Sequence, residues 1–324
     1  MALLLTSEDV ARLVTDQLAL DAVAAGFAAE RDGATHLPVR LDTDSPTGFL
    51  RVMPAVLDDV MGLKVMTLVR GLGTRYLVLL YGVDNGGLRA LVDADLVTKT
   101  RTAATTALAG QQLVAEAPES LAVIGTGFEA RGHLAFLARM WGLRRAVAYS
   151  RSEANRRSFA EDMTAELDLD VVAAGSSREA LASSHTVLLA TKSPEPVIDG
   201  RDLRSGSVVL SIGSTRPDLR ELDRESLRRA RVLVVDALEQ VTHESGDIID
   251  ALEHDAIARE RIVTLATVCA DGAPPPGDDG DRDVVVFKSA GTALQDLALA
   301  RRLYERACAE DVGRDVGTVT GLKP

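Results

Sequence analysis

Two glycines with a fixed spacing stand directly after an apolar run near the middle of the chain. The run Leu121–Ile124 is followed by Gly125-Thr126-Gly127-Phe128-Glu129-Ala130, which fits the pattern G-x-G-x-x-A. In this pattern the first glycine permits a tight turn, the second lets the backbone approach a pyrophosphate, and the small last residue lets a helix pack on the strand. The amide groups that begin such a helix bind the anion. A bare glycine turn is the alternative, but the strand before and the helix after favour dinucleotide binding by residues 125–129.

The end of the next predicted strand indicates which dinucleotide would bind. NAD-selective sites place an Asp or Glu there, which accepts a hydrogen bond from the ribose 2′-hydroxyl. This chain reads Tyr149-Ser150-Arg151-Ser152, with Arg156 one helical turn further on. An arginine with hydroxyl neighbours suits a 2′-phosphate. These residues therefore favour NADP(H), with NAD(H) as the alternative if Arg151 is only a solvated surface charge.

The elements around this loop indicate a parallel sheet. From residue 118 onward, apolar runs alternate with helical stretches, which is typical of βαβ units. An exposed loop rich in Gly, Pro and Asp is expected over residues 271–283, then a last strand and a final amphipathic helix over 292–309. The tail after Gly313 is expected to fray. The predicted strands are Leu121–Ile124, Ala146–Tyr149, Asp170–Ala173, Thr186–Ala190, Ser207–Ile212, Val232–Val235 and Val284–Phe287.

The first 117 residues have a different character. Ser7 is expected to cap a helix that continues to Phe27 and ends at Gly33. Apolar runs at 49–53, 63–69, 76–83 and 88–92, separated by glycine-rich turns, predict an antiparallel sheet, and 95–114 predicts a helix. The fold class is therefore α/β, with an α+β N-terminal domain over 1–117, a dinucleotide-binding domain over 118–290, and a C-terminal helix in 291–324 that returns to the first domain.

Composition limits the classes of function. The chain has 324 residues and a net charge of −12, and only 3% of its residues are aromatic. Nucleic-acid binding needs a basic face and stacking platforms, so we expect no nucleic-acid partner. No apolar stretch approaches the length of a membrane span, and no signal peptide is evident, so we expect a cytoplasmic protein without a membrane partner. The two cysteines are too few for a disulfide framework.

A metal site is not expected. His243 with Glu244, Asp247 and Asp250 lacks the tight spacing of metal ligands, and a solvated acidic helix is the simpler interpretation.

Motifs in a fixed order along nearly the whole chain resemble those of the ornithine cyclodeaminase/mu-crystallin family. The resemblance implies a Rossmann domain beside an N-terminal substrate and dimerisation domain, a homodimer, and chemistry at a small α-imino or α-amino acid. The motifs are Met53-Pro54-Ala55, Gly62-Leu63-Lys64-Val65, Arg101-Thr102-Ala103-Ala104, Ile124-Gly125-Thr126-Gly127, Ala190-Thr191-Lys192-Ser193, Arg220-Glu221-Leu222-Asp223 and Phe287-Lys288-Ser289-Ala290-Gly291.

The resemblance implies that Arg40, Lys64 and Arg101 hold the substrate carboxylate. Arginine offers a carboxylate two parallel hydrogen bonds, and lysine supplies a mobile point charge. Arg101 lies in an Ala-rich segment, where an unpaired buried guanidinium is costly, so the alternative is an internal salt bridge to an acidic residue. The resemblance further implies that Thr191, Gly213 and Ser289 lie near the cofactor, although Ser289 alternatively caps the final helix.

Two positions depart from the cyclodeaminase pattern. Thr215 stands where cyclodeaminases carry an Asp that handles the protons of the substrate amine. A threonine hydroxyl can orient a water or an imine, but it does not titrate near neutral pH. Arg51 stands where cyclodeaminases carry a Glu that recognises the side-chain amine. A cation there repels the ammonium of ornithine and favours an anionic or neutral substrate side chain, unless Arg51 points outward from its strand.

Both departures favour simple reduction of a C=N bond by NAD(P)H, with Lys64 as first candidate for proton supply. The leading hypothesis is an imine reductase or, in the reverse direction, an amino-acid dehydrogenase. The alternatives are an ammonia lyase of the cyclodeaminase type with bound NAD⁺, and a non-catalytic, nucleotide-regulated binding protein of the crystallin type. Likeness of fold does not separate them.

Overall fold

The computed structural model describes residues 2–274, 280–319 and 321. Contacts divide them into two compact units, one formed by residues up to Thr105 together with those from Thr292 on, the other by Thr106–Gly291. The division at Thr105 falls inside a helix, α3 (Asp95–Leu113), rather than at residue 117. Part of the predicted 271–283 loop, residues 275–279, lies outside the described residues.

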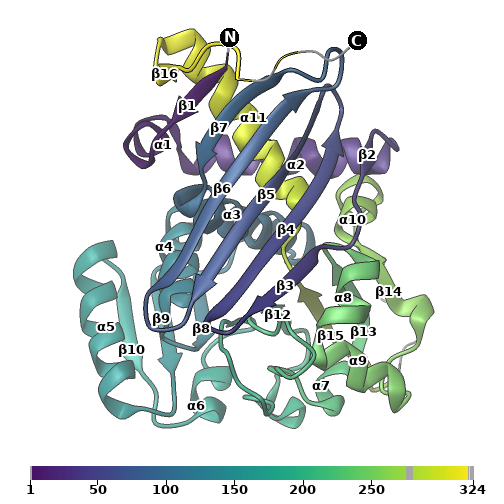
Figure 1. Ribbon diagram of the computed structural model, residues 1–324. Helices are drawn as coiled ribbons and strands as arrows, with labels where there is room; N and C mark the ends of the chain where they lie inside the picture. The colour runs from purple at the N-terminus through teal and green to yellow at the C-terminus, as the bar shows by residue number, and fades with distance from the viewer. Residues whose placement is uncertain (1, 275–279, 320, 322–324) are drawn as a thin grey trace. The chain divides into compact units, whose positions relative to one another are not determined.

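The first unit is built on a mixed sheet in the order β16-β1-β7-β6-β5-β4-β2, with β3 paired to β4. Four long strands form its antiparallel centre, and their alternation of buried and half-buried residues gives the sheet one core face. The helix α11 packs across β4, β5 and β6 and beside α2 (Figure 1). The strands are β1 (Leu3–Leu5), β2 (Thr35–His36), β3 (Leu41–Ser45), β4 (Gly48–Leu57), β5 (Val60–Val69), β6 (Gly73–Gly82), β7 (Leu88–Asp93) and β16 (Arg314–Asp315); the remaining helices are α1 (Ser7–Leu13), α2 (Asp16–Arg31) and α11 (Ala293–Glu310).

The structure corrects two expectations in this unit. The predicted first helix is two helices, and its cap is Thr6 rather than Ser7, because Thr6 and Asp9 form a capping box. The chain becomes extended at Val14, and Thr15 caps α2. The tail was expected to fray after Gly313, but Arg314–Asp315 pairs with β1 as β16. That pairing covers the outer edge of β1, whose other edge pairs with β7.

The second unit is a parallel sheet in the order β10-β9-β8-β11-β12-β15-β13-β14. All the predicted strands form, and only the three-residue β14 was missed, because so short a run carries little periodicity. The strands are β8 (Ser120–Ile124), β9 (Arg145–Tyr149), β10 (Asp170–Ala173), β11 (Thr186–Leu189), β12 (Val208–Ser211), β13 (Ala230–Val235), β14 (Ile262–Thr264) and β15 (Val284–Lys288). The helices are α4 (Phe128–Trp141), α5 (Glu153–Leu167), α6 (Ser177–Ala182), α7 (Arg224–Arg228), α8 (Leu238–Glu244), α9 (Gly246–Glu253) and α10 (Leu265–Asp271), with short 3-10 turns η1 (Gly200–Asp202) and η2 (Arg259–Arg261).

The strand order reverses at β8, which has β9 on one side and β11 on the other. In open α/β sheets, ligands bind beyond the carboxyl ends of the strands at such a reversal. The glycine loop follows β8 directly, so the topology puts it at that place.

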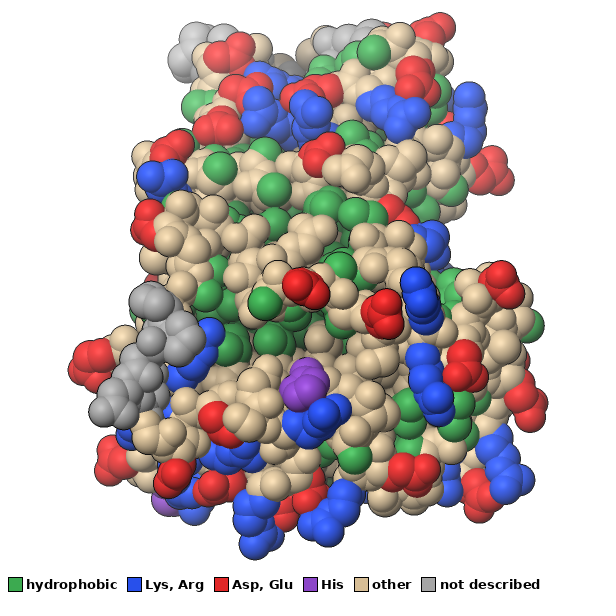
Figure 2. Space-filling model, turned by 180° about the vertical axis from the view of Figure 1, so that it is seen from behind, with side chains coloured by type: hydrophobic (Ala, Val, Ile, Leu, Met, Phe, Trp, Pro, Cys, Tyr) green, Lys and Arg blue, Asp and Glu red, His purple; other side chains and the backbone are tan. Residues whose placement is uncertain are grey.

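Positive and negative side chains are mixed on the face of the molecule seen from behind (Figure 2). On the face drawn in Figure 2, Lys and Arg side chains of the described residues are interspersed with Asp and Glu. None of the described helices is long and apolar enough to cross a membrane.

Candidate active site

The glycine loop has the geometry of a phosphate-binding turn. Gly125 has a φ of +115°, and a Cβ atom there would lie 2.2 Å from the carbonyl oxygen of Ala190. Gly127 is the N-cap of α4, with open space where a Cβ atom would stand, and no described side chain caps this helix. The amides at a helix N-terminus of this kind can bind an anion. Phe128 and Glu129 begin the helix, and Thr126 completes the turn.

The predicted 2′-phosphate residues lie next to this loop, because the Gly125 amide donates to the carbonyl of Tyr149 at 2.9 Å. Ser152 caps α5 by accepting from the amide of Asn155. Arg156 donates to the carbonyl of Ser150 at 3.1 Å and lies over the ring of Tyr149, 5.7 Å from its centroid. Arg151 is exposed. The segment thus presents one exposed guanidinium at the end of β9, with no carboxylate in residues 149–152.

The segments that follow β11 and β12 are tied together by a buried carboxylate, Glu221. Thr191 donates to it through both its amide, at 2.6 Å, and its hydroxyl, at 2.9 Å. The amide of Gly213 donates to the other carboxylate oxygen at 2.8 Å. The sequence singled out Thr191 and Gly213 but gave Glu221 no role beyond its motif. Thr215 lies half-buried in the loop after β12.

The Ser289 hydroxyl bonds to a carboxylate, whereas a helix cap would bond to an amide of the final helix. Its hydroxyl donates to Asp236 at 2.7 Å, and the amides of Ala290 and Gly291 donate to the same carboxylate. The N-cap of α11 is Thr292, so the alternative that Ser289 caps this helix is wrong. Asp236, which the sequence did not single out, fixes the turn after β15.

The expected solvated acidic helix is wrong for Asp247 and Asp250, which are buried, whereas His243 is exposed. Asp247 of α9 is buried, accepts from the amides of Glu221 and Leu222 at 2.6 and 2.9 Å, and lies 3.2 Å from the ammonium of Lys288. Asp250 forms a two-bond ion pair with Arg224, and those hydrogen bonds lower the pKa of Asp250. Asp247 lies inside because buried amides and the buried ammonium of Lys288 need acceptors there, whereas Asp250 pairs with the half-exposed Arg224. No three metal-ligating side chains gather among the residues described.

In the first unit, two predicted substrate ligands share one carboxylate. Lys64 of β5 donates to Asp296 of α11 at 2.9 and 3.1 Å, and Arg101 of α3 donates to the same group at 2.8 Å. Arg101 also donates to Gln295 at 2.6 Å, and all four side chains are buried. The ammonium of Lys64 lies 5.3 Å from the centroid of the Tyr76 ring. The internal salt bridge that the sequence left open therefore exists, with Asp296 as its acid.

Burial lowers the pKa of Lys64 to about 8. The negative charge of Asp296 acts in the opposite direction, while the positive charges of Arg101 and Arg40 lower the value further. Desolvation, together with the two neighbouring positive charges, thus outweighs the one carboxylate.

Arg51 lies on the core face of the sheet. It stands two residues before Met53, and Met53 pairs with Lys64, so the period of a strand puts Arg51 on the Lys64 side. Its guanidinium holds Asp42 of the neighbouring strand through two bonds of 2.6 and 2.5 Å, which lower the pKa of that carboxyl. Arg40, half-buried, stands just before β3 and also lowers the pKa of Asp42. Arg51 does not point outward, and it carries its own counter-ion.

The model of the ornithine cyclodeaminase/mu-crystallin family matches residues 1–311. The chain belongs to this family. Ketimine reductase mu-crystallin of Mus musculus is 30% identical over 296 residues, which cover 88% of this chain and 90% of the relative. The structure of Thermococcus litoralis Delta(1)-pyrroline-2-carboxylate reductase, in complex with NADH and L-proline, is similar with a TM-score of 0.88 and 30% identity, and covers 97% of this chain and 100% of that one. An archaeal alanine dehydrogenase dimer with bound NAD has a TM-score of 0.88 at 28% identity, with 98% of this chain and 99% of that chain covered. The predicted family and fold class are confirmed.

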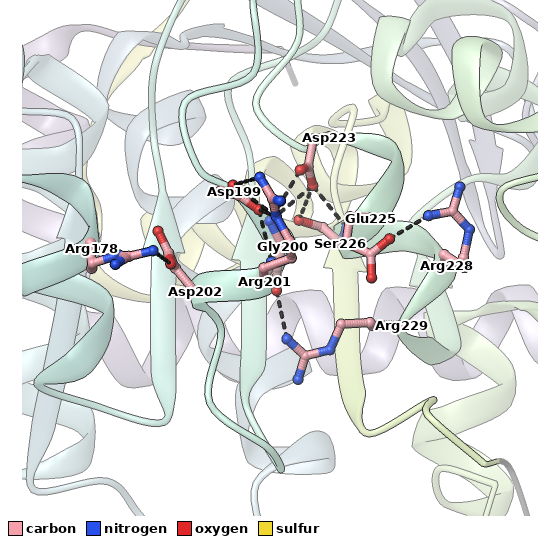
Figure 3. Close-up of polar contacts among 10 residues, drawn as sticks. All are labelled: Arg178, Asp199, Gly200, Arg201, Asp202, Asp223, Glu225, Ser226, Arg228 and Arg229. Carbon is pink, nitrogen blue, oxygen red and sulfur yellow. Dashed lines mark hydrogen bonds and ion pairs between the residues drawn. The ribbon is translucent and has the colours of Figure 1, made fainter.

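One motif of the ornithine cyclodeaminase/mu-crystallin family, Arg220–Asp223, divides into two roles. Glu221 faces the ends of β11 and β12, whereas Asp223 caps α7 through Ser226 and accepts from the amide of Gly200 in η1 at 3.1 and 3.2 Å (Figure 3). A Cβ atom at Gly200 would lie 2.3 Å from the Ser226 amide nitrogen, so η1 and α7 touch through their backbones. Asp223 therefore stabilises the contact between η1 and α7.

Proposed function

We propose that this chain is an NAD(P)H-dependent reductase of α-imino acids that acts, in the reverse direction, as an amino-acid dehydrogenase. The observation that carries the proposal is the charge of the buried cluster in the first unit. Lys64 and Arg101 bring two positive charges, and Asp296 returns one. A buried charge without a counter-ion is costly, so the cluster is suited to one more anion.

The α-carboxylate of an imino or amino acid supplies that anion. Arg101 and Lys64 are the proposed first ligands, and Arg40, whose charge also acts on Lys64, is the third. Arg51 is proposed to meet the substrate side chain. Because Asp42 already neutralises Arg51, a neutral side chain fits without any rearrangement, and an anionic one fits if it displaces Asp42.

Lys64 is the proposed source of the proton. With a pKa of about 8 its ammonium form dominates at neutral pH, yet it releases a proton far more readily than an exposed lysine. The nicotinamide, when bound, supplies the hydride. Orientation of the C=N bond and placement of charge are then the main tasks of the protein, and Thr215 is proposed to orient a water or the imine.

The proposed cofactor is NADP(H), with NAD(H) as the alternative. Its pyrophosphate is assigned to residues 125–129, and its 2′-phosphate to Ser150, Arg151, Ser152 and Arg156. The exposed Arg151 at the end of β9 supports this preference, because a carboxylate is what a free 2′-hydroxyl would need. Thr191, Gly213 and Ser289 are proposed to border the nicotinamide half.

A homodimer is the proposed assembly, supported by the alanine dehydrogenase relative, whose structure is a dimer. The cytoplasm is the proposed compartment, since Cys269 and Cys308 are free thiols.

The test is a panel of cyclic and linear imino acids, offered with NADPH and with NADH side by side. The proposal expects oxidation of the reduced cofactor that depends on the imino acid, and faster turnover with NADPH. Release of ammonia from ornithine without net change in nicotinamide absorbance would show a cyclodeaminase instead. Cofactor binding without turnover of any imino acid would favour the non-catalytic binding protein.

A further inference from the structure

A single buried carboxylate spans the ends of two neighbouring strands in the second unit. One oxygen of Glu221 accepts from the amide and the hydroxyl of Thr191, at 2.6 and 2.9 Å. The other accepts from the hydroxyl of Ser211 and the amide of Gly213, both at 2.8 Å. Glu221 is fully buried. Each oxygen thus has two donors, and the carboxylate connects the chain after β11 with the chain after β12.

These two segments lie on one side of the strand reversal at β8. In folds of this kind the residue that reads the adenosine ribose stands at the end of the second strand, here β9. The dinucleotide crosses the crevice, so its nicotinamide half belongs on the opposite side, beyond β11 and β12. The donors to Glu221 are at those strand ends, and none of the four comes from the β9 side.

The backbone segments at Gly125, Ala190–Thr191 and Gly213 are packed in direct contact. A Cβ atom at Gly213 would stand 2.0 Å from the carbonyl oxygen of Thr191, and one at Gly125 would stand 2.2 Å from that of Ala190. A peptide group is planar, so fixing the Thr191 amide also fixes the direction of the Ala190 carbonyl. The carboxylate of Glu221 therefore sets the orientation of a peptide group that lies against the glycine loop.

Two further buried charged residues, Asp247 and Lys288, fix the position of Glu221. Its own amide donates to Asp247 at 2.6 Å, and the ammonium of Lys288 lies 3.2 Å from Asp247 and 3.7 Å from Glu221. Lys288 also donates to the Ser211 hydroxyl at 2.9 Å, and that hydroxyl in turn donates to Glu221. A network of buried charge that is fully satisfied specifies one arrangement of the groups it joins.

We propose that Glu221 is a positioning residue for the nicotinamide half of the cofactor. Its carboxylate is occupied by four protein donors, and its role is to orient the peptide groups at Thr191 and Gly213, which are proposed to border the nicotinamide. The inference rests on the proposed dinucleotide site and adds to it a separate determinant for one half of the ligand.

The experiment measures, by isothermal titration calorimetry, the affinities of two ligands for the wild type and for Glu221→Gln. One is the dinucleotide that the wild type binds more tightly; the other is the same molecule without nicotinamide, ADP-ribose for NADH or 2′-phospho-ADP-ribose for NADPH. The glutamine side chain is isosteric, but its NH₂ group faces donors whichever way the amide turns. We expect affinity for the whole dinucleotide to fall at least about 10-fold, as for a lost charged hydrogen bond, while the nicotinamide-free ligand stays within about 2-fold.

Asp223→Asn is the matched control, because Asp223 lies two residues away, caps α7 and binds η1 (Figure 3). It should lower the unfolding midpoint without changing the ratio of the two affinities. Ser211→Ala is a milder second variant, which removes one donor to Glu221 and should move the ratio in the same direction if Glu221→Gln does not fold.

Equal weakening of both ligands, or no weakening of either, would overturn the role of Glu221 and leave the proposed function standing. A wild-type protein that binds neither ligand would instead overturn the proposed function, and the role of Glu221 with it.

Discussion

Replacement of Lys64 by methionine separates a functional lysine from a structural one. The pKa of Lys64 is about 8, against 10.5 for an ordinary lysine. The difference, at about 1.36 kcal/mol per pH unit, means that the folded site disfavours the ammonium by about 3 kcal/mol relative to the neutral amine. Methionine has a similar shape and no charge, and Lys64→Met leaves Asp296 paired with Arg101. The variant should therefore be as stable as the wild type or more stable at pH 7, by up to about 3 kcal/mol.

The lowered pKa of Lys64 also predicts how the unfolding free energy changes with pH. The folded protein holds Lys64 with the lower pKa, so between about pH 8 and 10.5 the unfolded chain binds more protons, and the unfolding free energy of the wild type rises across that window. Any advantage of Lys64→Met should shrink over the same window, as urea unfolding at pH 7 and pH 10 would show. Activity should fall about 10- to 100-fold in kcat/KM, the loss expected for a charged hydrogen bond to the substrate carboxylate.

Lys288→Met is the matched control. Lys288 is equally buried, but it faces two carboxylates, Glu221 and Asp247, so its loss leaves negative charge uncompensated and should cost about 3–5 kcal/mol. If Lys64→Met lost as much stability as Lys288→Met, Lys64 would be the structural counter-ion of Asp296. The claim that Lys64, Arg101 and Asp296 leave one positive charge for a substrate carboxylate would then be refuted.

Three further predictions concern the cofactor and the proton. Gly125→Ala should lower both the unfolding midpoint and the cofactor affinity, because the φ of Gly125 is positive and an added Cβ atom would meet Ala190. Gly127→Ala should lower only the cofactor affinity, because a Cβ atom there meets no atom of the described part of the chain. Equal unfolding midpoints of the two variants would contradict this prediction. Arg151→Asp should move the ratio of kcat/KM for NADPH and NADH at least about 10-fold toward NADH, and an unmoved ratio would remove the 2′-phosphate assignment. Since Lys64 must be charged, kcat/KM for the imino acid should fall as the pH rises through about 8, and Lys64→Arg should abolish that limb of the profile; a limb that persists belongs to another group.

The sequence predicted the parts of the molecule that depend on local pattern. The glycine loop, the strands around it and the long strands β4–β7 follow from spacing and hydrophobic period, and they form where expected. The partner of Lys64 could not be predicted, because Asp296 lies 232 residues away and looks, on its own helix, like an ordinary polar position. Asp247 misled for a related reason, since its acidic helix suggests a solvated face, while its partners Glu221 and Lys288 become neighbours only in the folded sheet.

Removal of the carboxylate from the substrate tests the central claim most directly. Single-turnover oxidation of NADPH would be followed with Δ1-pyrroline-2-carboxylate and with 1-pyrroline, which has the same C=N bond and no carboxylate. If Lys64 and Arg101 hold the α-carboxylate, the first compound should react at least about 100-fold more efficiently than the second, as two charged hydrogen bonds predict, and Arg101→Met should narrow the gap. Equal reaction of the two compounds in the wild type would contradict the assignment of the buried cationic cluster as the substrate site.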